Sequence, residues 1–313
     1  MIKLLKKIKR KFLLYFSFFM YPIYLLINNY RYKKYHLNIL SNQEIIDKIK
    51  NEHISISRYG DGEFSMILNK TYSIGFQRAN SILSNRLEEI LKNYDNSNSK
   101  HMIGVIGVLN PNELSKYKKH VRVFWTDYIF RKFNILKKYL KRECVYFDSL
   151  LTRCYMDYED KSGTEKRYVD LKSIWDDKDI IIIEGDKTKM GIGNDLFDNA
   201  RSIKRIICPS NDAFSKYDDI LSQAKQICKN KLTLVALGPT ATVLSYDLCS
   251  LNPSDYQVLD LGHMDIEYEW YRLGAEKKVA INGKAVNEVK SIDLSNNSID
   301  DKKYLSQIVK IIK

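Results

Sequence analysis

Short apolar runs alternate with amphipathic stretches along most of the chain. Six runs rich in branched apolar residues, each closed by turn-forming or polar residues, predict strands at residues 54–57, 102–108, 179–185, 203–210, 232–239 and 256–263. Between the last four runs lie stretches of helical periodicity, such as residues 213–228 and 240–248, that are long enough to cross over a sheet. Continuous apolar strands that alternate with helices are typical of a parallel sheet covered on both faces. The pattern therefore predicts an α/β domain with a mainly parallel sheet flanked by helices.

Three other segments complete this organisation. Residues 42–50 have a helical pattern, and residues 110–172, which are rich in Tyr, Lys and Arg, are expected to form an inserted helical region. The last part of the chain, from residue 285, is expected to be a helical or partly loose tail. We therefore divide the chain into a basic and apolar segment (1–37), a main domain (38–290) and a C-terminal tail (291–313).

The N-terminal segment has the composition of a membrane-associating helix. Residues 12–27 carry no charge, and lysines and arginines flank them on both sides. A spanning helix needs about 20 apolar residues, and Pro22 interrupts this shorter stretch. We therefore expect an apolar and basic helix that lies on the cytoplasmic leaflet and binds anionic lipid. A single-pass anchor, or a helix packed against its own domain or a partner, is the alternative.

The positive charge of the protein is concentrated in this same segment. The formal net charge is +13, and residues 1–43 contain nine lysines and arginines but no acidic residue. Because the main domain has little excess charge, no nucleic-acid partner is expected. The 5 cysteines are scattered without a C-x-x-C pair, which indicates reduced thiols in a cytosolic protein rather than a disulfide framework.

Two carboxylates follow the first predicted strand of the main domain. Asp61 and Glu63 lie just after Arg58 and next to two glycines that free the backbone from regular structure. Ligands of parallel sheets bind at the carboxyl ends of the strands, so both acids can turn toward one point there. Such oxygen ligands suit Mn²⁺ or Mg²⁺, whose coordination substrate phosphates complete. The sequence thus predicts a metal site with Arg58 as a phosphate partner; a turn with solvated acids is the alternative.

The loop after residues 179–185 combines positive charge with glycines. Lys189, between other lysines and glycines, could approach a phosphate together with backbone amides, although the loop lacks the spacing of a Walker motif. Asn194 and Asp195 follow this loop and precede an apolar pair. Their side chains are expected either to contact a ligand or to cap a helix.

Polar residues also follow the last three predicted strands. They are Ser210, Asn211, Thr240, Thr242, His263 and Asp265. Pro239 stands where a helix is expected to begin, and the free amides of such an N-terminus suit an anion, although capping alone would also explain the threonines. His263 is expected to be a base, a metal ligand or a hydrogen-bonded residue, and Asp265 is either a general base or an acid stabilised by the helix dipole.

Four separated segments contain these residues in a fixed order. They are residues 57–64 with the pair Phe76 and Gln77, residues 184–214, residues 237–248 and residues 259–270. Together they resemble the bacterial GT-D-type glycosyltransferases over roughly residues 40–290. The resemblance implies a Rossmann-like sheet and a nucleotide-sugar-dependent transferase, in which Asp61 and Glu63 support Mn²⁺ or Mg²⁺ at the donor diphosphate. Tyr59 stands where many relatives are expected to have Phe.

The resemblance also implies roles for the strand-end residues. We assign catalysis to Asp61, Glu63, Asp265 and His263, and donor binding to Arg58, Gln77, Lys189, Asn194, Asp195, Ser210, Asn211, Thr240 and Thr242. An acceptor hydroxyl would attack the anomeric carbon of the donor. If the reaction inverts configuration, a base is needed, and Asp265 is the first candidate with His263 the second.

The expected function is transfer of a sugar from a nucleoside-diphosphate sugar, with UDP as the expected nucleotide. The acceptor would be a glycan, glycolipid or glycoprotein in the assembly of bacterial surface polysaccharide or glycoconjugate. Residues 1–37 would hold the cytoplasmic enzyme at the inner face of the cell membrane, close to such acceptors. Two alternatives are a Rossmann-type methyltransferase and a membrane-tethered polyanion-binding protein.

Overall fold

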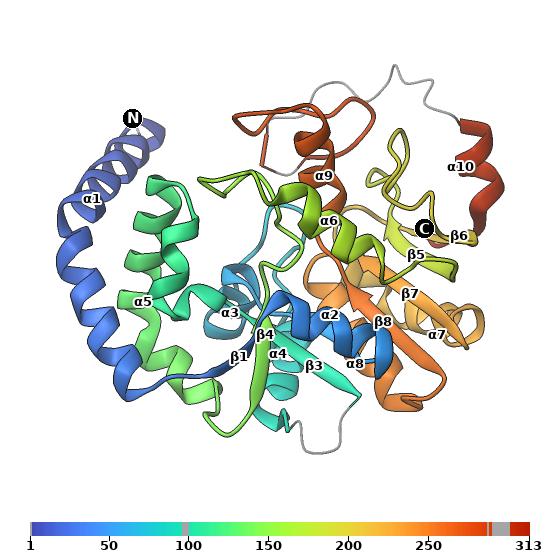
Figure 1. Cartoon of the computed structure of the whole chain (residues 1–313), viewed down its shortest axis with the longest axis horizontal. Helices are drawn as coiled ribbons and strands as arrows, with labels where there is room; N and C mark the ends of the chain where they lie inside the picture. The colour runs from blue at the N-terminus through green and yellow to red at the C-terminus, as the bar shows by residue number, and fades with distance from the viewer. Residues whose placement is uncertain (1, 96–99, 287, 290–300) are drawn as a thin grey trace.

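One large parallel sheet forms the centre of the fold. The computed structural model describes residues 2–95, 100–286, 288–289 and 301–313 (Figure 1). Over these residues the strands pair in the order β1-β4-β3-β2-β8-β7-β5-β6-β9, and each strand pairing is parallel. The α/β class and the mainly parallel, Rossmann-like sheet predicted from the sequence are therefore confirmed.

The described elements have the following bounds. The strands are β1 (Asn38–Leu40), β2 (Ser55–Arg58), β3 (His101–Val105), β4 (Val145–Asp148), β5 (Asp179–Gly185), β6 (Ser202–Cys208), β7 (Lys231–Ala236), β8 (Tyr256–Asp260) and β9 (Ile308–Ile311). The helices are α1 (Ile2–Lys34), α2 (Asn42–Asn51), α3 (Asp61–Leu68), α4 (Ser81–Asn93), α5 (Lys119–Tyr139), α6 (Thr164–Lys172), α7 (Tyr217–Ile227), α8 (Pro239–Leu251), α9 (Met264–Arg272) and α10 (Asp301–Gln307). Short 3₁₀ turns are η1 (Gly107–Leu109), η2 (Pro111–Lys116) and η3 (Ala213–Lys216).

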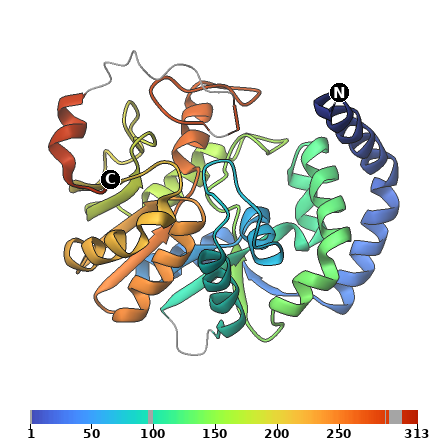
Figure 2. The same ribbon diagram turned by 180° about the vertical axis from the view of Figure 1, so that it is seen from behind.

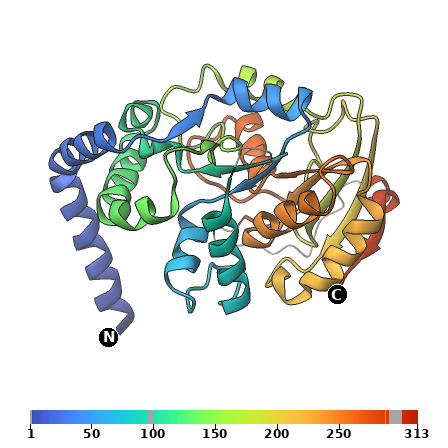
Figure 3. The ribbon, with the colours of Figure 1, turned by 90° about the horizontal axis from the view of Figure 1, so that it is seen from below.

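Helices cover both faces of the sheet, because successive strand residues point to opposite sides. In β5, Ile180 and Ile182 pack in the core formed with α2, α6 and α9, whereas Ile181 and Ile183 pack against α7 and α8. Figure 3 shows α2 and α6 on one side of the sheet and α4, α7 and α8 on the other. The strands are therefore buried on both faces, which explains their continuous apolar character.

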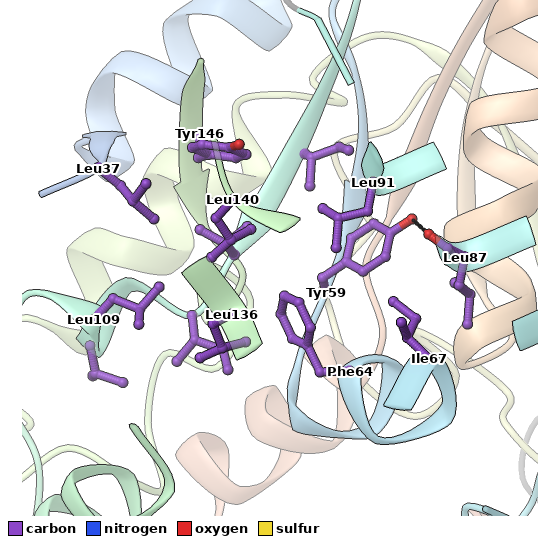
Figure 4. Packing of buried hydrophobic residues seen from close by; sticks show 14 of the residues in the cluster. Leu37, Tyr59, Phe64, Ile67, Leu87, Leu91, Leu109, Leu136, Leu140 and Tyr146 are labelled. Carbon is purple, nitrogen blue, oxygen red and sulfur yellow. Dashed lines mark hydrogen bonds between the residues drawn. The ribbon is translucent and has the colours of Figure 1, made fainter. Parts of the chain in front are cut away.

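A third part of the core lies between α3, α4, α5 and the sheet (Figure 4). Tyr59, directly after β2, is fully buried there, and its hydroxyl donates a hydrogen bond to the carbonyl oxygen of Leu87 at 3.0 Å. Phe64 of α3 packs in the same cluster, with its ring centroid 6.1 Å from that of Tyr59. This packing holds the first turn of α3 against the end of β2.

The chain leaves the neighbouring strands β2 and β8 toward opposite faces of the sheet. After β2 it enters α3 and α4, which pack in the same core as α5, and after β8 it enters α9, which packs with α2 and α6. The carboxyl ends of two such strands diverge and leave a crevice, the usual ligand position in open α/β sheets. The predicted carboxylates after β2 therefore lie at this switch point.

Three strands were not predicted. β4 falls within residues 110–172, where an inserted helical region was expected; the helices α5 and α6 are present, but a four-residue strand separates them. β1 has 3 residues, and β9 lies in the tail that was expected to be helical or loose. Short strands like these show too few alternations to be detected, and their pairing partners are distant in sequence. The predicted boundary between residues 290 and 291 lies outside the described residues.

The N-terminal helix packs on its own domain, which was one of the three alternatives considered. The amide of Asn28 donates a hydrogen bond to the carbonyl oxygen of Thr126 in α5 at 2.9 Å, and the Tyr24 ring stacks on Phe130 at 3.8 Å. Figure 2 shows α1 lying along α5. Although an interruption was expected, α1 continues through Pro22, since packing on α5 can offset one lost backbone hydrogen bond. None of the described helices has both the length and the apolar character required to cross a membrane.

Candidate active site

The predicted carboxylate pair occupies the first turn of α3. Glu63 accepts a hydrogen bond from the backbone N–H of Gly60 at 2.9 Å, which closes the N-terminus of the helix. Asp61 is exposed and Glu63 is partly buried. Gly62 is required by packing, because a Cβ atom there would lie 2.8 Å from the Cδ1 atom of Ile74. Gly62 therefore lets α3 pack closely against Ile74, whereas the expectation that the glycines free the two acids from regular structure is wrong, since both acids lie in α3.

The site carries uncompensated negative charge. Burial, and then the charges of Asp260 and Asp61, raise the pKa of Glu63 to about 7. Within the part of the chain that the structure describes, neither Asp61 nor Glu63 forms an ion pair. Repulsion between close carboxylates is what a divalent cation would relieve. The two residues therefore fit a metal ion.

The small number of protein ligands suits a metal ion that is bound partly by the substrate. Over the described residues, no group of three or more His, Cys, Asp and Glu side chains is arranged to hold a metal. An ion held by Asp61 and Glu63 would thus keep most of its coordination positions for water and substrate. This arrangement is typical of Mg²⁺ sites completed by substrate phosphates.

Arg58 joins three segments below the carboxylates. Its guanidinium lies 3.2 Å from the Oδ1 atom of Asp260 on β8 and donates to the Oγ1 atom of Thr152 at 2.9 Å. Thr242 of α8 donates to the carbonyl oxygen of Arg58 at 3.1 Å. Arg58 and Thr242, which were both predicted to bind the nucleotide-sugar donor, therefore form hydrogen bonds with other residues of the protein in this structure. Asp260 was not among the predicted site residues, although its place at the end of a predicted strand was a usable indication.

Gly262 is required by this arginine. Its φ is +52°, and a Cβ atom at this position would lie 1.7 Å from the Nη2 atom of Arg58. The loop after β8 can therefore cross the guanidinium only with glycine here.

His263 follows as the N-cap residue of α9. Burial, and then the positive charges of Arg153, Arg58 and Lys278, lower the pKa of His263 to about 4, against the opposing charge of Glu288. The imidazole is consequently neutral at neutral pH. Arg153 pairs with Glu288 at 2.9 Å, and Lys278 pairs with the same carboxylate at 3.3 Å. These cations come from loops without a recognisable pattern, which is why sequence analysis missed them.

Asp265 lies in a buried network with residues of two loops. Its Oδ1 atom accepts hydrogen bonds from the backbone of Gly191 and the amide of Asn194, both at 2.8 Å, and its Oδ2 atom lies 2.7 Å from Nζ of Lys284. Glu269 pairs with the same lysine at 2.8 Å. Because its oxygens are satisfied by a cation and two N–H groups, the geometry favours a positioning role for Asp265.

The remaining predicted residues lie near the ends of β5, β6 and β7. Asp195 pairs with Lys172 at 2.8 Å, and the Lys189 ammonium lies 5.7 Å from the Tyr304 ring centroid. The hydroxyl of Ser210 accepts a hydrogen bond from the backbone of Lys187 at 2.8 Å.

Gln77 is buried between two of these segments. Its amide donates to Asp212 at 2.6 Å, and it accepts a hydrogen bond from Thr240 at 3.3 Å. Asn211 is exposed in the loop after β6. The structure thus places Arg58, Asp61 and Glu63 at the end of β2 and His263 after the neighbouring strand β8, with Arg58 close enough to His263 to contribute, after burial and Arg153, to the lowering of its pKa. The other predicted residues, except Thr242, lie at the part of the sheet edge formed by the carboxyl ends of β7, β5 and β6.

The model of the glycosyltransferase GT-D fold family matches residues 56–289 of this chain. This range includes the switch point and the loops around it. The chain belongs to the GT-D-fold glycosyltransferases. The matched range begins in β2 and includes the carboxylate pair, so this family's characteristic region and the candidate site coincide. The two rival functions, a methyltransferase and a polyanion-binding protein, are correspondingly less favoured.

Similar proteins are described as glycosyltransferases as well. The probable glycosyl transferase Gly of Streptococcus gordonii is 38% identical over 275 residues, which cover 87% of this chain and 38% of that protein. Glycosyltransferase GlyD of Streptococcus pneumoniae serotype 4 is 37% identical over 266 residues, which cover 85% of this chain and 31% of that protein. The chain thus spans about a third of the length of these curated relatives.

Solved GT-D structures cover the same part of the chain. One, described as the domain of unknown function 1792 with a distinct glycosyltransferase fold, superposes with a TM-score of 0.82 at 35% identity, covering 92% of this chain and 100% of the other. Another, described as a new glycosyltransferase from Streptococcus sanguinis, gives a TM-score of 0.79 at 35% identity and covers 89% and 100% of the two chains. The GT-D fold predicted from the sequence is confirmed.

Proposed function

We propose that this protein transfers a sugar from a nucleoside-diphosphate sugar in a metal-dependent reaction, with UDP as the nucleotide. The observation that carries the proposal is the pair of carboxylates, Asp61 and Glu63, at the switch point, neither of which forms an ion pair with another described residue. The acceptor would be a glycan, glycolipid or glycoprotein in the assembly of bacterial surface polysaccharide or glycoconjugate. Family membership supports the glycosyl transfer, and the remaining details are part of the proposal.

Asp61 and Glu63 would hold Mn²⁺ or Mg²⁺. A bound divalent ion would neutralise the negative charge that develops on the diphosphate as the anomeric bond breaks. On the α9 side of the carboxylates, Arg153 and Lys278 add positive charge near His263. Arg153 and Lys278 both pair with Glu288, so donor phosphates would compete with that carboxylate there, as they would with Asp260 at Arg58.

A base is needed if the reaction inverts configuration, and His263 is then the better candidate. Its imidazole is neutral at neutral pH and would accept the proton of the acceptor hydroxyl, although burial and the cations that keep it neutral also make it a weak base. Asp265, the first candidate from the sequence, is buried and bound to Lys284, so proton transfer to its carboxylate would weaken that ion pair. Asp265 would instead position the loop after β5 beside α9.

Titration of UDP into the full chain, with and without Mn²⁺, tests the proposal. Binding should depend on the metal in the unaltered protein and in Glu52→Gln, which removes an exposed acid paired with Lys48 on α2. It should be lost in Glu63→Gln, which keeps the shape but not the charge. ADP and GDP serve as nucleotide controls. UDP binding that is equal with and without Mn²⁺ in all three proteins would contradict the metal assignment.

Attachment to the inner face of the membrane is the second part of the proposal. Phe16, Phe19, Ile23, Leu26 and Tyr30, at intervals of three and four residues, form an exposed apolar stripe on α1, on the side opposite α5. Basic residues precede and follow this α1 apolar stripe in the sequence, and no acid occurs before Glu44. Apolar burial combined with attraction to anionic lipid is the binding mode of interfacial helices. Such a position would keep the enzyme close to lipid-linked acceptors.

A further inference from the structure

The inner edge of α5 presents aromatic side chains near the carboxylate pair. Phe124 and Tyr128 lie one helical turn apart with ring centroids 6.2 Å apart and planes at 28°. Trp125 supports both rings from the core, with its centroid 4.9 Å from Phe124 and 5.6 Å from Tyr128. Phe124 is nevertheless 49% exposed. We call Phe124 and Tyr128 the α5 aromatic edge.

This edge lies beside α3, which carries the carboxylates. Tyr128 packs on the same core cluster as Phe64 of α3 and Ile74, the residue that covers Gly62. Burial, and then the charges of Asp61 and Glu63, raise the pKa of the Tyr128 hydroxyl above its ordinary value. The hydroxyl is therefore a proton donor that lies within the field of both carboxylates.

The Tyr128 hydroxyl has an unused hydrogen bond. Its oxygen is inaccessible to solvent, and no other described residue lies within hydrogen-bonding distance of it. A buried hydroxyl without a partner is unfavourable by about 1–3 kcal/mol, so such groups usually have a ligand or water partner. Because this oxygen is shielded in the structure, the Tyr128 side chain would have to shift before a hydroxyl group of a bound substrate could supply the missing acceptor.

The surroundings of His263 and the α5 aromatic edge differ in charge. Arg153 and Lys278 lie near His263, where both pair with Glu288. The α5 aromatic edge carries no charge and offers a ring face and one hydroxyl. A sugar ring has an apolar C–H face and a polar rim, and it complements such a surface because aromatic faces are weakly negative.

We propose that the α5 aromatic edge is the binding site for the acceptor saccharide, with a sugar ring stacked on Phe124 and one of its hydroxyl groups bonded to Tyr128. This inference rests on the proposed function, since an acceptor is needed only if the protein transfers sugars. It specifies the acceptor as a saccharide at the reacting end, whatever lipid or protein carries that sugar. A nucleobase could also stack on Phe124, and the experiment separates the two ligands.

The test uses full-length protein and p-nitrophenyl glycosides of common hexoses as acceptor probes, with UDP-hexoses as donors. Phe124→Leu removes the ring but keeps apolar bulk, and Phe124→Tyr keeps the ring. Tyr128→Phe removes only the hydroxyl, and Val169→Ala on α6 is the control for an exposed apolar residue. Measurements are the acceptor KM, the rate of donor hydrolysis without acceptor, and UDP affinity with Mn²⁺.

Phe124→Leu and Tyr128→Phe should each raise the acceptor KM on the order of tenfold, because either change removes one specific contact. Donor hydrolysis and UDP affinity should stay within about twofold, Val169→Ala should resemble the unaltered protein, and Phe124→Tyr, which keeps the ring, should raise the acceptor KM less than Phe124→Leu does.

Three results would overturn the inference while leaving the proposed function intact. They are an unchanged acceptor KM in both variants, a parallel loss of UDP affinity, which would make Phe124 a nucleobase contact, and donor hydrolysis without transfer to any glycoside. If the unaltered protein neither binds UDP nor hydrolyses a donor, the proposed function itself fails.

Discussion

At the residue scale, the candidate site depends on a few small residues that let charged groups approach one another. Gly262 crosses the guanidinium of Arg58, and Gly62 packs below Ile74. These contacts hold the carboxylate pair and the loop after β8 against the end of the sheet. Replacing such a glycine tests packing, whereas replacing a carboxylate tests chemistry, so the two kinds of change should have different effects.

Gly262→Ala should destabilise the fold by about 2–4 kcal/mol, since a new Cβ atom 1.7 Å from Arg58 forces the arginine or the loop to move. Gly274→Ala is the matched control, because Gly274 has a similar φ of +58° but no atom within 4 Å of a new Cβ. It should cost only the backbone strain of about 1–2 kcal/mol. Urea unfolding followed by circular dichroism measures both, and equal losses would argue against the packing explanation.

Metal binding should strengthen as the pH rises toward and above 7. The pKa of Glu63 is raised to about 7 by burial and by its carboxylate neighbours, so below that pH a proton competes with the metal. Mn²⁺ affinity should therefore increase about tenfold per pH unit on the acidic side and level off above the pKa. Calorimetric titration of Mn²⁺ at several pH values checks this. A pH-independent affinity, or a slope that persists in Glu63→Gln, would assign the effect to another group.

At the element scale, α1 has two faces with different partners. Asn28 and Tyr24 pack on α5, and Phe19 and Leu26 on the opposite side are 76% and 70% exposed. Deleting α1 would expose the apolar surface of α5 around Phe130, so point substitutions on the exposed face are the cleaner test.

The double variant Phe19→Ser and Leu26→Ser should bind vesicles containing anionic lipid on the order of a hundredfold more weakly. Each large apolar side chain contributes roughly 1.5–3 kcal/mol when fully buried, and only part of that is gained at an interface. Vesicle co-sedimentation measures the affinity, with Val169→Ser as the control and neutral vesicles as a second comparison. Unchanged vesicle binding would contradict the proposal.

At the scale of the whole molecule, the switch point separates two groups of predicted residues. Asp61, Glu63, Arg58 and His263 lie where β2 and β8 diverge. Asp265 lies in the first turn of α9, yet its carboxylate turns to Asn194, in the loop after β5, and to Lys284, in the segment after α9. His263 and Asp265 are only two positions apart in the sequence. His263 nevertheless belongs to the candidate site, whereas Asp265 belongs to a buried ion-pair network.

His263→Gln and Asp265→Asn should separate these roles. If the reaction inverts configuration, loss of the base should lower kcat at least about 100-fold in His263→Gln, with little effect on stability. Asp265→Asn weakens the pairing with Lys284, so it should lower the free energy of unfolding by about 1–3 kcal/mol and kcat much less. Steady-state kinetics and urea unfolding of both variants provide the comparison. A stable Asp265→Asn protein without activity would restore Asp265 as the base.

The principal strands, the crossover helices after β6 and β7, and the carboxylate pair were predictable from local pattern. Periods of two and 3.6 residues, and polar residues at strand ends, are properties of short segments. The four-residue β2 was recognised because Ile54 and Ile56 alternate with serines, whereas the similarly short β1, β4 and β9 show no such alternation. β9 also pairs with β6, about 100 residues earlier in the chain.

By itself, the sequence determined the class of fold, the basic and apolar character of the N-terminal helix and the presence of two carboxylates after a strand. Only the tertiary structure decided which charges meet. Arg58 binds Asp260, 202 residues away, and Lys284 neutralises Asp265 and Glu269. The physical reason is that residue type and spacing set local conformation and burial, whereas the pairing of charges depends on strand order and on the paths of loops across the sheet edge.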